Sequence, residues 1–110
     1  MKNLFNVSVL LLFFISNISY SQNSTPNTVD SYYSTKVNTA LSLELFAVDL
    51  DFDDTITFSI VSNPSNGSVS LSGSTVLYTP SSNYIGTDTF TYKANDGTAD
   101  SQTKTVSVKV

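Results

Sequence analysis

The sequence is 110 residues long and contains five lysines, no arginine and nine acidic residues, for a net charge of −4. This length fits one domain, and an acidic, arginine-free chain makes nucleic acid and anionic membrane surfaces poor partners. Cysteine and histidine are absent, which excludes disulfide bonds, thiol nucleophiles and the commonest general base.

The first 21 residues have the layout of a secretory signal peptide. A positive start over residues 1–3 precedes an apolar run over 4–15, and Ser19 and Ser21 place small residues before a cleavage site at Gln22. The alternative is a membrane anchor, but twelve helical residues cover about 18 Å, well short of the roughly 30 Å hydrocarbon core. We therefore expect a secreted, extracellular or cell-surface protein with no transmembrane anchor in this chain. The mature chain has four lysines against nine acids, a net charge of −5.

Residues 22–29 are polar and predict a flexible lead-in, and the domain itself is predicted over residues 30–110. Short segments of alternating apolar and polar residues are separated here by Gly, Pro, Asn and Ser, which is typical of β-strands joined by turns. Leucine and glutamate in 41–48 also favour a helix, but the strict alternation of that segment favours a strand. The predicted strands are 28–37, 41–48, 55–61, 68–71, 75–79, 87–94 and 103–110.

The strand predicted over 87–94 alternates cleanly. Successive side chains of a strand point to opposite faces of its sheet. One face of this strand is therefore predicted to be buried and largely aromatic, and comprises Asp88, Phe90, Tyr92 and Ala94. The other face is predicted to be solvated, and comprises Thr87, Thr89, Thr91 and Lys93. The remaining strands are expected to cover the aromatic face.

Seven strands with turn signals about every 8–12 residues, and no convincing helix, predict an all-β fold. The expected architecture is a seven-stranded antiparallel Greek-key β-sandwich, and a small closed barrel is the alternative. Pro80 is expected to end its strand because proline lacks a backbone donor. Gly67 and Gly86 are expected where a side chain would clash or where φ must be positive.

Spaced motifs run along most of the mature chain. They are Asp49-x-Asp51, Pro64-x-x-Gly67, Tyr78-Thr79-Pro80 and Tyr84-x-Gly86-x-Asp88-x-Phe90-x-Tyr92-x-x-x-Asp96-Gly97. In these motifs the chain resembles bacterial immunoglobulin-like and cadherin-like domains, which often occur in tandem in large secreted or surface proteins. The resemblance implies a seven-stranded sandwich, a role in adhesion, spacing or matrix assembly, and bound calcium in many members.

A group of aspartates is the candidate metal site. Ala-x-Asp occurs at 47–49 and again at 94–96, in two loops that emerge at the same end of such a sandwich. Clustered carboxylates repel one another unless a cation lies between them, and hard oxygen ligands select Ca²⁺. The resemblance to cadherin-like domains implies that the matching aspartates act as calcium ligands. The candidates are Asp49, Asp51, Asp53, Asp54 and Asp96.

Two departures from the cadherin-like pattern predict weak calcium binding. Only residues 22–30 stand where that pattern has the acidic linker of a preceding domain, and no glutamate lies near 36–38. A site of this kind belongs with weak extracellular calcium modules, with Kd on the order of 10⁻⁴–10⁻³ M. A solvated acidic turn is the alternative interpretation.

The sequence favours a non-catalytic adhesion or spacer module. Its expected partners are extracellular proteins, polysaccharide surfaces or neighbouring repeats of the same kind. A carbohydrate-binding module is the alternative, and it would present a planar row of aromatic side chains; Tyr32 and Tyr33 are adjacent, so one of them must face outward from a strand. An enzyme is the third class, but Glu44 is the only glutamate, so an acid pair would need aspartates alone.

Overall fold

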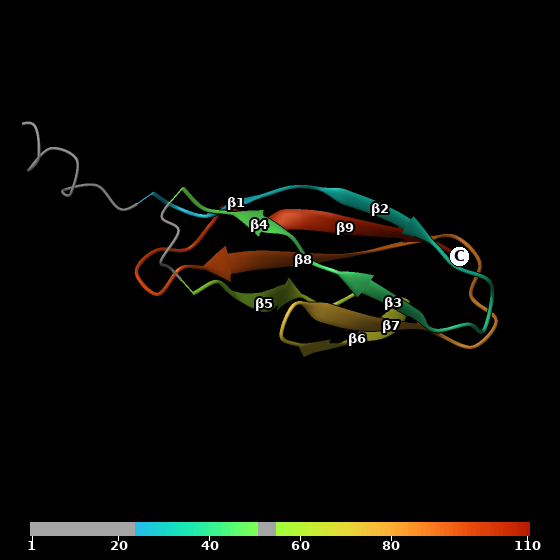
Figure 1. Cartoon of the computed structure of the whole chain (residues 1–110). Helices are drawn as coiled ribbons and strands as arrows, with labels where there is room; N and C mark the ends of the chain where they lie inside the picture. The colour runs from blue at the N-terminus through green and yellow to red at the C-terminus, as the bar shows by residue number, and fades with distance from the viewer. Residues whose placement is uncertain (1–23, 51–54) are drawn as a thin grey trace, which may run out of the picture.

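The structure is a computed structural model that describes residues 24–50 and 55–110. Within these ranges the chain forms nine β-strands and no helix, so no described helix could cross a membrane (Figure 1). The predicted signal peptide lies outside the described residues. The strands are β1 (Asn27–Thr28), β2 (Ser31–Ser34), β3 (Leu41–Glu44), β4 (Ala47–Val48), β5 (Thr57–Ser62), β6 (Gly67–Ser72), β7 (Thr75–Pro80), β8 (Thr87–Asn95) and β9 (Lys104–Lys109).

The strands form a four-stranded sheet in the order β2-β9-β8-β5, a three-stranded sheet in the order β3-β7-β6, and a two-stranded pair β1-β4. Every pair is antiparallel except β2 and β9, which run parallel. The prediction of a wholly antiparallel sandwich is therefore wrong at this edge. Alternation along a strand reports which face is buried but not the direction of the neighbouring strand, so the sequence pattern could not reveal the parallel pair.

Two short strands raise the strand count above the seven expected. The strand predicted over 28–37 is replaced by β1 and β2; β1, which lies within the predicted lead-in over 22–29, pairs with Ala47–Val48. The segment predicted as one strand over 41–48 is divided because β3 pairs with β7 whereas β4 pairs with β1, and the chain passes from one pairing to the other at residues 45 and 46. β3 and β4 consequently belong to different sheets.

The core lies between the four-stranded and three-stranded sheets. The inner face of β8 behaves as its alternation predicts: Asp88, Phe90, Tyr92 and Ala94 are 0–3% exposed. Buried apolar side chains of the neighbouring strands pack against them, namely Leu43, Val76, Tyr78, Val106 and Val108. Removing this much apolar surface from water is the main stabilising term for a domain without disulfide bonds.

Two glycines are required by the tyrosine rings beside them. A Cβ at Gly67 would lie 2.7 Å from Thr79 O and 2.9 Å from the Tyr78 ring, so only glycine lets β6 approach β7 this closely. Gly86 has a φ of 148°, and a Cβ there would lie 2.8 Å from the Tyr84 hydroxyl. Both positions confirm the expectation that a side chain would clash or φ would be positive.

The two ends of β8 define two poles of the domain. At the end of β8 that leads to Asp96, the Thr28 hydroxyl donates to Gln102 O at 2.9 Å. We call this end the Asp96 pole. At the other end, Gly86 and Val110 exchange backbone hydrogen bonds of 3.2 and 2.8 Å, and we call it the Gly86 pole. Figure 1 shows β1 and β4 near the first pole and the C-terminus at the second.

Candidate functional site

Two of the five predicted calcium ligands, Asp49 and Asp96, belong to the described residues. Asp51, Asp53 and Asp54 lie outside them. Asp49 follows β4 and Asp96 follows β8, and Thr28 links the two loops: it pairs with Ala47 and its hydroxyl lies 3.5 Å from Ser101 Oγ. Asp49 and Asp96 therefore both lie at the Asp96 pole.

Asp96 organises its own loop. It is 5% exposed, and its Oδ1 accepts the backbone N–H groups of Thr98 at 2.8 Å and Ala99 at 2.7 Å. The backbone N–H of Asp96 in turn donates to Ala99 O at 3.2 Å. Aspartate is favoured in such turns because its short carboxylate can accept backbone donors two and three residues later. This position has a structural role whether or not a metal binds.

Ca²⁺ takes six to eight oxygen ligands, and the described residues at this pole supply only part of such a set. Within residues 24–50 and 55–110 no group of three or more metal-ligating side chains converges. One oxygen of Asp96 is already committed to two backbone donors. Calcium binding therefore stays a prediction, and it depends on the aspartates that follow Asp49.

A further acidic residue at the same pole forms an ion pair. The carboxylate of Asp100 accepts a hydrogen bond from Lys93 Nζ at 2.8 Å and another from Asn95 Nδ2 at 2.8 Å. The bond from Lys93, followed by the one from Asn95, lowers the pKa of Asp100. Both partners are solvent-exposed in part, so the pair contributes little stability. No sequence motif connects Asp100 with this pole.

Another buried acidic residue, Asp88, lies away from this pole and accepts several hydrogen bonds. It is 3% exposed, and its Oδ2 accepts the Tyr78 hydroxyl at 2.8 Å and the Asn66 N–H at 3.2 Å, while Oδ1 accepts the Thr89 N–H at 3.1 Å. Burial, followed by this hydrogen bond to a carboxylate, raises the pKa of Tyr78. The sequence placed Asp88 on the inner face, but no motif indicated that Tyr78 and the residue before Gly67 would bind it.

The two adjacent tyrosines of β2 point to opposite faces, as expected. Tyr33 points toward β3, and its hydroxyl donates to Glu44 O at 3.1 Å. Tyr32 lies on the outer face and is 79% exposed. Together with Phe46, at 62%, it is one of two exposed aromatic side chains among residues 24–50 and 55–110. Tyr32 belongs to the four-stranded sheet, whereas Phe46 lies between β3 and β4 of the other two sheets, so the exposed aromatic side chains of these residues do not share one sheet face.

Two packed sheets around a core of tyrosine, phenylalanine and valine, with polar loops at the poles, define an immunoglobulin-like domain. The sequence matches the profile of a known family over residues 23–109. The chain belongs to the bacterial Ig domain family, which confirms the resemblance seen in the motifs. Among curated proteins, no relative matches it.

Solved structures with the same fold include parts of polysaccharide-degrading enzymes. Endo-fucoidan hydrolase MfFcnA9, of glycoside hydrolase family 107, matches with a TM-score of 0.59 and 16% identity, over 82% of this chain and 16% of that one. Endo-fucoidan hydrolase MfFcnA4 matches with a TM-score of 0.55 and 20% identity, over 82% of this chain and 14% of that one. The chain thus spans less than a fifth of the length of these enzymes, and the likeness shows the fold alone.

Proposed function

We propose that this chain is a non-catalytic module that works outside the cell as a spacer or adhesion unit. The observation that carries the proposal is that the first strand and the last residue, Val110, lie at opposite poles of the domain. Thr28 lies at the Asp96 pole and Val110 at the Gly86 pole, and the nine residues of β8 between them span roughly 30 Å at about 3.3 Å per residue. A domain connected at opposite ends adds its length to a polypeptide.

The described acidic residues support a non-catalytic role. Asp88 and Asp96 are buried and accept hydrogen bonds from the domain itself. The Glu44 carboxylate accepts bonds from the hydroxyls of Ser74 and Thr75, and the bond from Thr75, followed by the one from Ser74, lowers the pKa of Glu44. A general acid needs a raised pKa near the working pH, so Glu44 is unsuited to that task.

Family membership, the apolar N-terminal run and the sheet orders support the rest of the proposal. Bacterial Ig domains are typically parts of extracellular or surface proteins. The orders β2-β9-β8-β5 and β3-β7-β6 support Greek-key connectivity of the two larger sheets. The matched enzymes are several times longer than this chain, which supports a role beside other domains. Export is tested by fractionating the native host: N-terminal sequencing of the extracellular or surface fraction should begin at Gln22.

The spacer role is tested with two copies joined in tandem, from Val110 of the first to Gln22 of the second. Small-angle X-ray scattering should show a maximum dimension that exceeds that of one mature copy by at least the roughly 30 Å length of β8. A tandem whose two copies fold back side by side, with little increase in length, would overturn the spacer role. Joining the same two copies through a long Gly/Ser linker provides the control for flexible separation.

Carbohydrate binding is the second candidate function, and the exposed ring of Tyr32 is the observation that favours it. Binding to a polysaccharide could use one aromatic ring together with neighbouring polar side chains on a sheet face, without a row of aromatic rings. The outer face of the four-stranded sheet, which carries Tyr32, offers such a surface.

A further inference from the structure

Side chains on the outer face of the four-stranded sheet form two short rows across β2, β9 and β8. The strand registers align Tyr32 with Ser107 and Thr89 in one row. They align Ser34 with Lys109 and Thr87 in the next. Neighbouring strands lie about 4.8 Å apart, and residues two apart in a strand are separated by roughly 6.6 Å. The two rows therefore form a grid whose spacings are comparable to the dimensions of a sugar ring.

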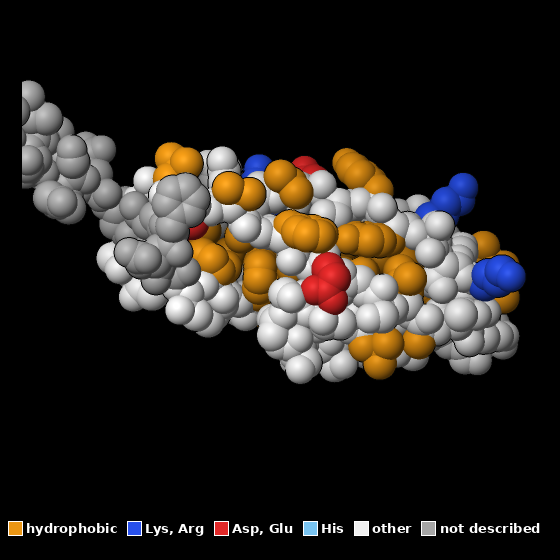
Figure 2. All heavy atoms as spheres, in the orientation of Figure 1, with side chains coloured by type: hydrophobic (Ala, Val, Ile, Leu, Met, Phe, Trp, Pro, Cys, Tyr) orange, Lys and Arg blue, Asp and Glu red, His pale blue; other side chains and the backbone are white. Residues whose placement is uncertain are grey.

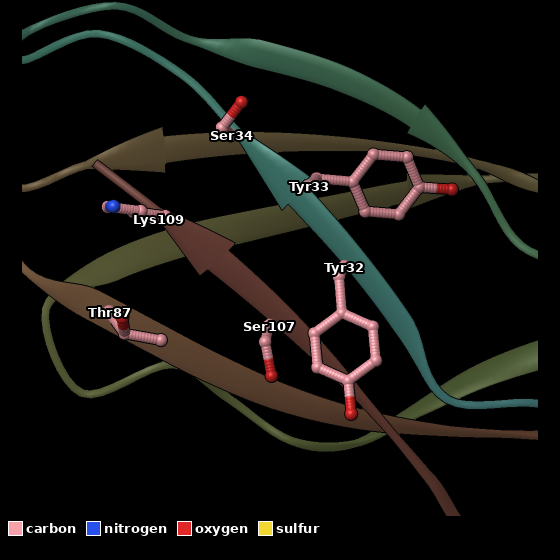
Figure 3. Close-up of a pocket in the computed structure, with 6 residues that line it drawn as sticks. All are labelled: Tyr32, Tyr33, Ser34, Thr87, Ser107 and Lys109. Carbon is pink, nitrogen blue, oxygen red and sulfur yellow. The ribbon is translucent and has the colours of Figure 1, made fainter.

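A shallow pocket of about 570 Å³ lies over this grid, within the range of small-ligand sites. Its lining combines one exposed aromatic ring with several hydroxyls and one ammonium group (Figure 3). The lining residues are Tyr32, Tyr33, Ser34, Thr87, Ser107 and Lys109. This mixture suits a ligand with an apolar ring face and polar edges.

The fold fixes the orientation of Tyr32. Its neighbour Tyr33 packs against the core and is bonded to Glu44 O at 3.1 Å, so alternation along β2 directs Tyr32 outward. Figure 3 shows the Tyr32 ring on the same side of the sheet as Ser107, with Tyr33 pointing away. An aromatic ring on a hydrogen-bonded strand loses little conformational entropy on binding, and offers its face to the C–H groups of a sugar.

The pocket is lined by one charged residue, the cationic Lys109, although the mature chain is acidic. Lys109 is exposed, and the only ion pair among the described residues is the one between Lys93 and Asp100. Thr35 N donates to Lys109 O at 2.9 Å. Lys36 directly follows Thr35, so its backbone lies near that of Lys109. Figure 2 shows cationic side chains at the end of the molecule where the C-terminus lies in Figure 1. Asp30 directly precedes β2, and its carboxylate accepts the Thr105 N–H at 2.9 Å. Thr105 lies four residues before Lys109 on β9, so Asp30 is two rows away from Lys109.

We propose that this pocket binds an anionic polysaccharide. A sugar ring stacks on Tyr32, its hydroxyls exchange hydrogen bonds with Ser107 and Thr87, and a sulfate or carboxylate substituent lies against the Lys109 ammonium. A charge-assisted hydrogen bond to lysine is stronger than a neutral one, so the ammonium selects for the charged sugar. The inference rests on the proposed extracellular role and gives the adhesion surface a ligand class.

Affinity electrophoresis of the mature chain tests the proposal with two matched pairs of polymers. Dextran sulfate is compared with neutral dextran, and polygalacturonate with its methyl ester, which separates sulfate from carboxylate recognition. The chain should be retarded by at least one anionic polymer and less by its neutral counterpart. Because the mature chain carries a net charge of −5, non-specific attraction to a polyanion is disfavoured. Absence of retardation by both anionic polymers overturns the proposal.

Variants locate the site. Tyr32→Ala should weaken retardation about fivefold or more, because the stacking ring is lost. Tyr32→Phe keeps the ring and should retain most of the retardation. Lys109→Gln should abolish the preference for the charged polymer. Phe46→Ala is the matched control for an exposed aromatic ring. Lys104→Gln is the control for charge, because Lys104 lies five residues before Lys109 on the same strand and so on the opposite face. Equal losses in controls and site variants overturn the proposal, while the scattering result for the tandem is independent of either outcome.

Discussion

The two faces of β8 show how one strand can serve two purposes. Its inner side chains are at most 3% exposed, from Asp88 to Ala94, and contact the opposite sheet through the shared core. Its outer side chains, Thr87 and Thr89 among them, are exposed and lie opposite Lys109 and Ser107 of β9. The same two-residue period thus separates the residues that stabilise the domain from those that can contact a ligand. Substitutions on the two faces should differ several-fold in their effect on stability.

The largest effect is expected on the inner face, from Phe90→Ala. Phe90 is 1% exposed and belongs to the core cluster. Removing its ring leaves a cavity between the sheets, and such substitutions cost about 3–5 kcal/mol of the free energy of unfolding. Urea denaturation followed by fluorescence measures the loss. A change below about 1 kcal/mol would mean that the two sheets are not packed around this ring.

The next effect concerns the carboxylate at the start of the same inner face. Tyr78→Phe removes the hydroxyl that donates to Asp88 Oδ2 at 2.8 Å. Hydrogen bonds to charged groups contribute about 1.5–3 kcal/mol, and a buried acceptor left with fewer donors adds to the cost. Tyr84→Phe is the matched control, because the Tyr84 hydroxyl donates to a carbonyl, Thr87 O, at an exposed site. Equal losses in the two variants would argue against a special role for the bond to Asp88.

The same tyrosine predicts how stability depends on alkaline pH. Burial and the Asp88 carboxylate raise the pKa of Tyr78, and burial raises that of Tyr92. Above pH of about 10 an unfolded tyrosine releases its proton while these two keep theirs in the folded state, so the unfolded state binds fewer protons. The free energy of unfolding must then fall as pH rises. Urea midpoints between pH 8 and pH 11 should decline in the native chain and decline less in Tyr78→Phe; parallel declines would contradict this assignment.

Much of the fold could be predicted because burial leaves a direct signature in the sequence. Alternation identified both faces of β8. The requirement for glycine at Gly67 and Gly86 could be predicted because glycine has no Cβ and tolerates a positive φ. The parallel pairing of β2 with β9 could not be predicted in this way, since the period of a strand is the same in either direction. The division of 41–48 into β3 and β4 follows from their different pairing partners, β7 and β1, and no local pattern encodes such pairings.

The candidate sites were less predictable than the fold. The motif around Asp96 indicated a metal ligand, whereas the structure shows its carboxylate accepting the N–H groups of Thr98 and Ala99. Both roles favour the same residue type in the same kind of loop, so sequence cannot separate them. The donors of Asp88 come from strands distant in sequence, and the grid around Tyr32 depends on the registers of three strands. Such sites follow from tertiary pairing and become visible only with it.

Calcium should produce a smaller change than either inner-face variant. If the aspartates that follow Asp49 in the sequence complete a weak site with Kd near 10⁻³ M, 5 mM Ca²⁺ stabilises the folded state by about 1 kcal/mol. Thermal melting of the mature chain with increasing Ca²⁺ measures this shift, with Mg²⁺ as the control ion. Asp51→Asn should reduce the shift. An unchanged midpoint at several millimolar Ca²⁺ would leave the acidic loop as a solvated turn and discard the metal site.

The smallest effect is expected on the outer face, from Thr89→Ala. Thr89 is exposed and lies between the inner-face positions Asp88 and Phe90, opposite Ser107 of β9. Its exposed side chain is not part of the core cluster, so its loss should change the free energy of unfolding by no more than about 0.5 kcal/mol. Measured beside Phe90→Ala under the same conditions, it tests whether adjacent residues of one strand are energetically independent. A loss comparable to that of Phe90 would show that the hydroxyl face also holds the sheet together, and the division between a stabilising face and a contact face would fail.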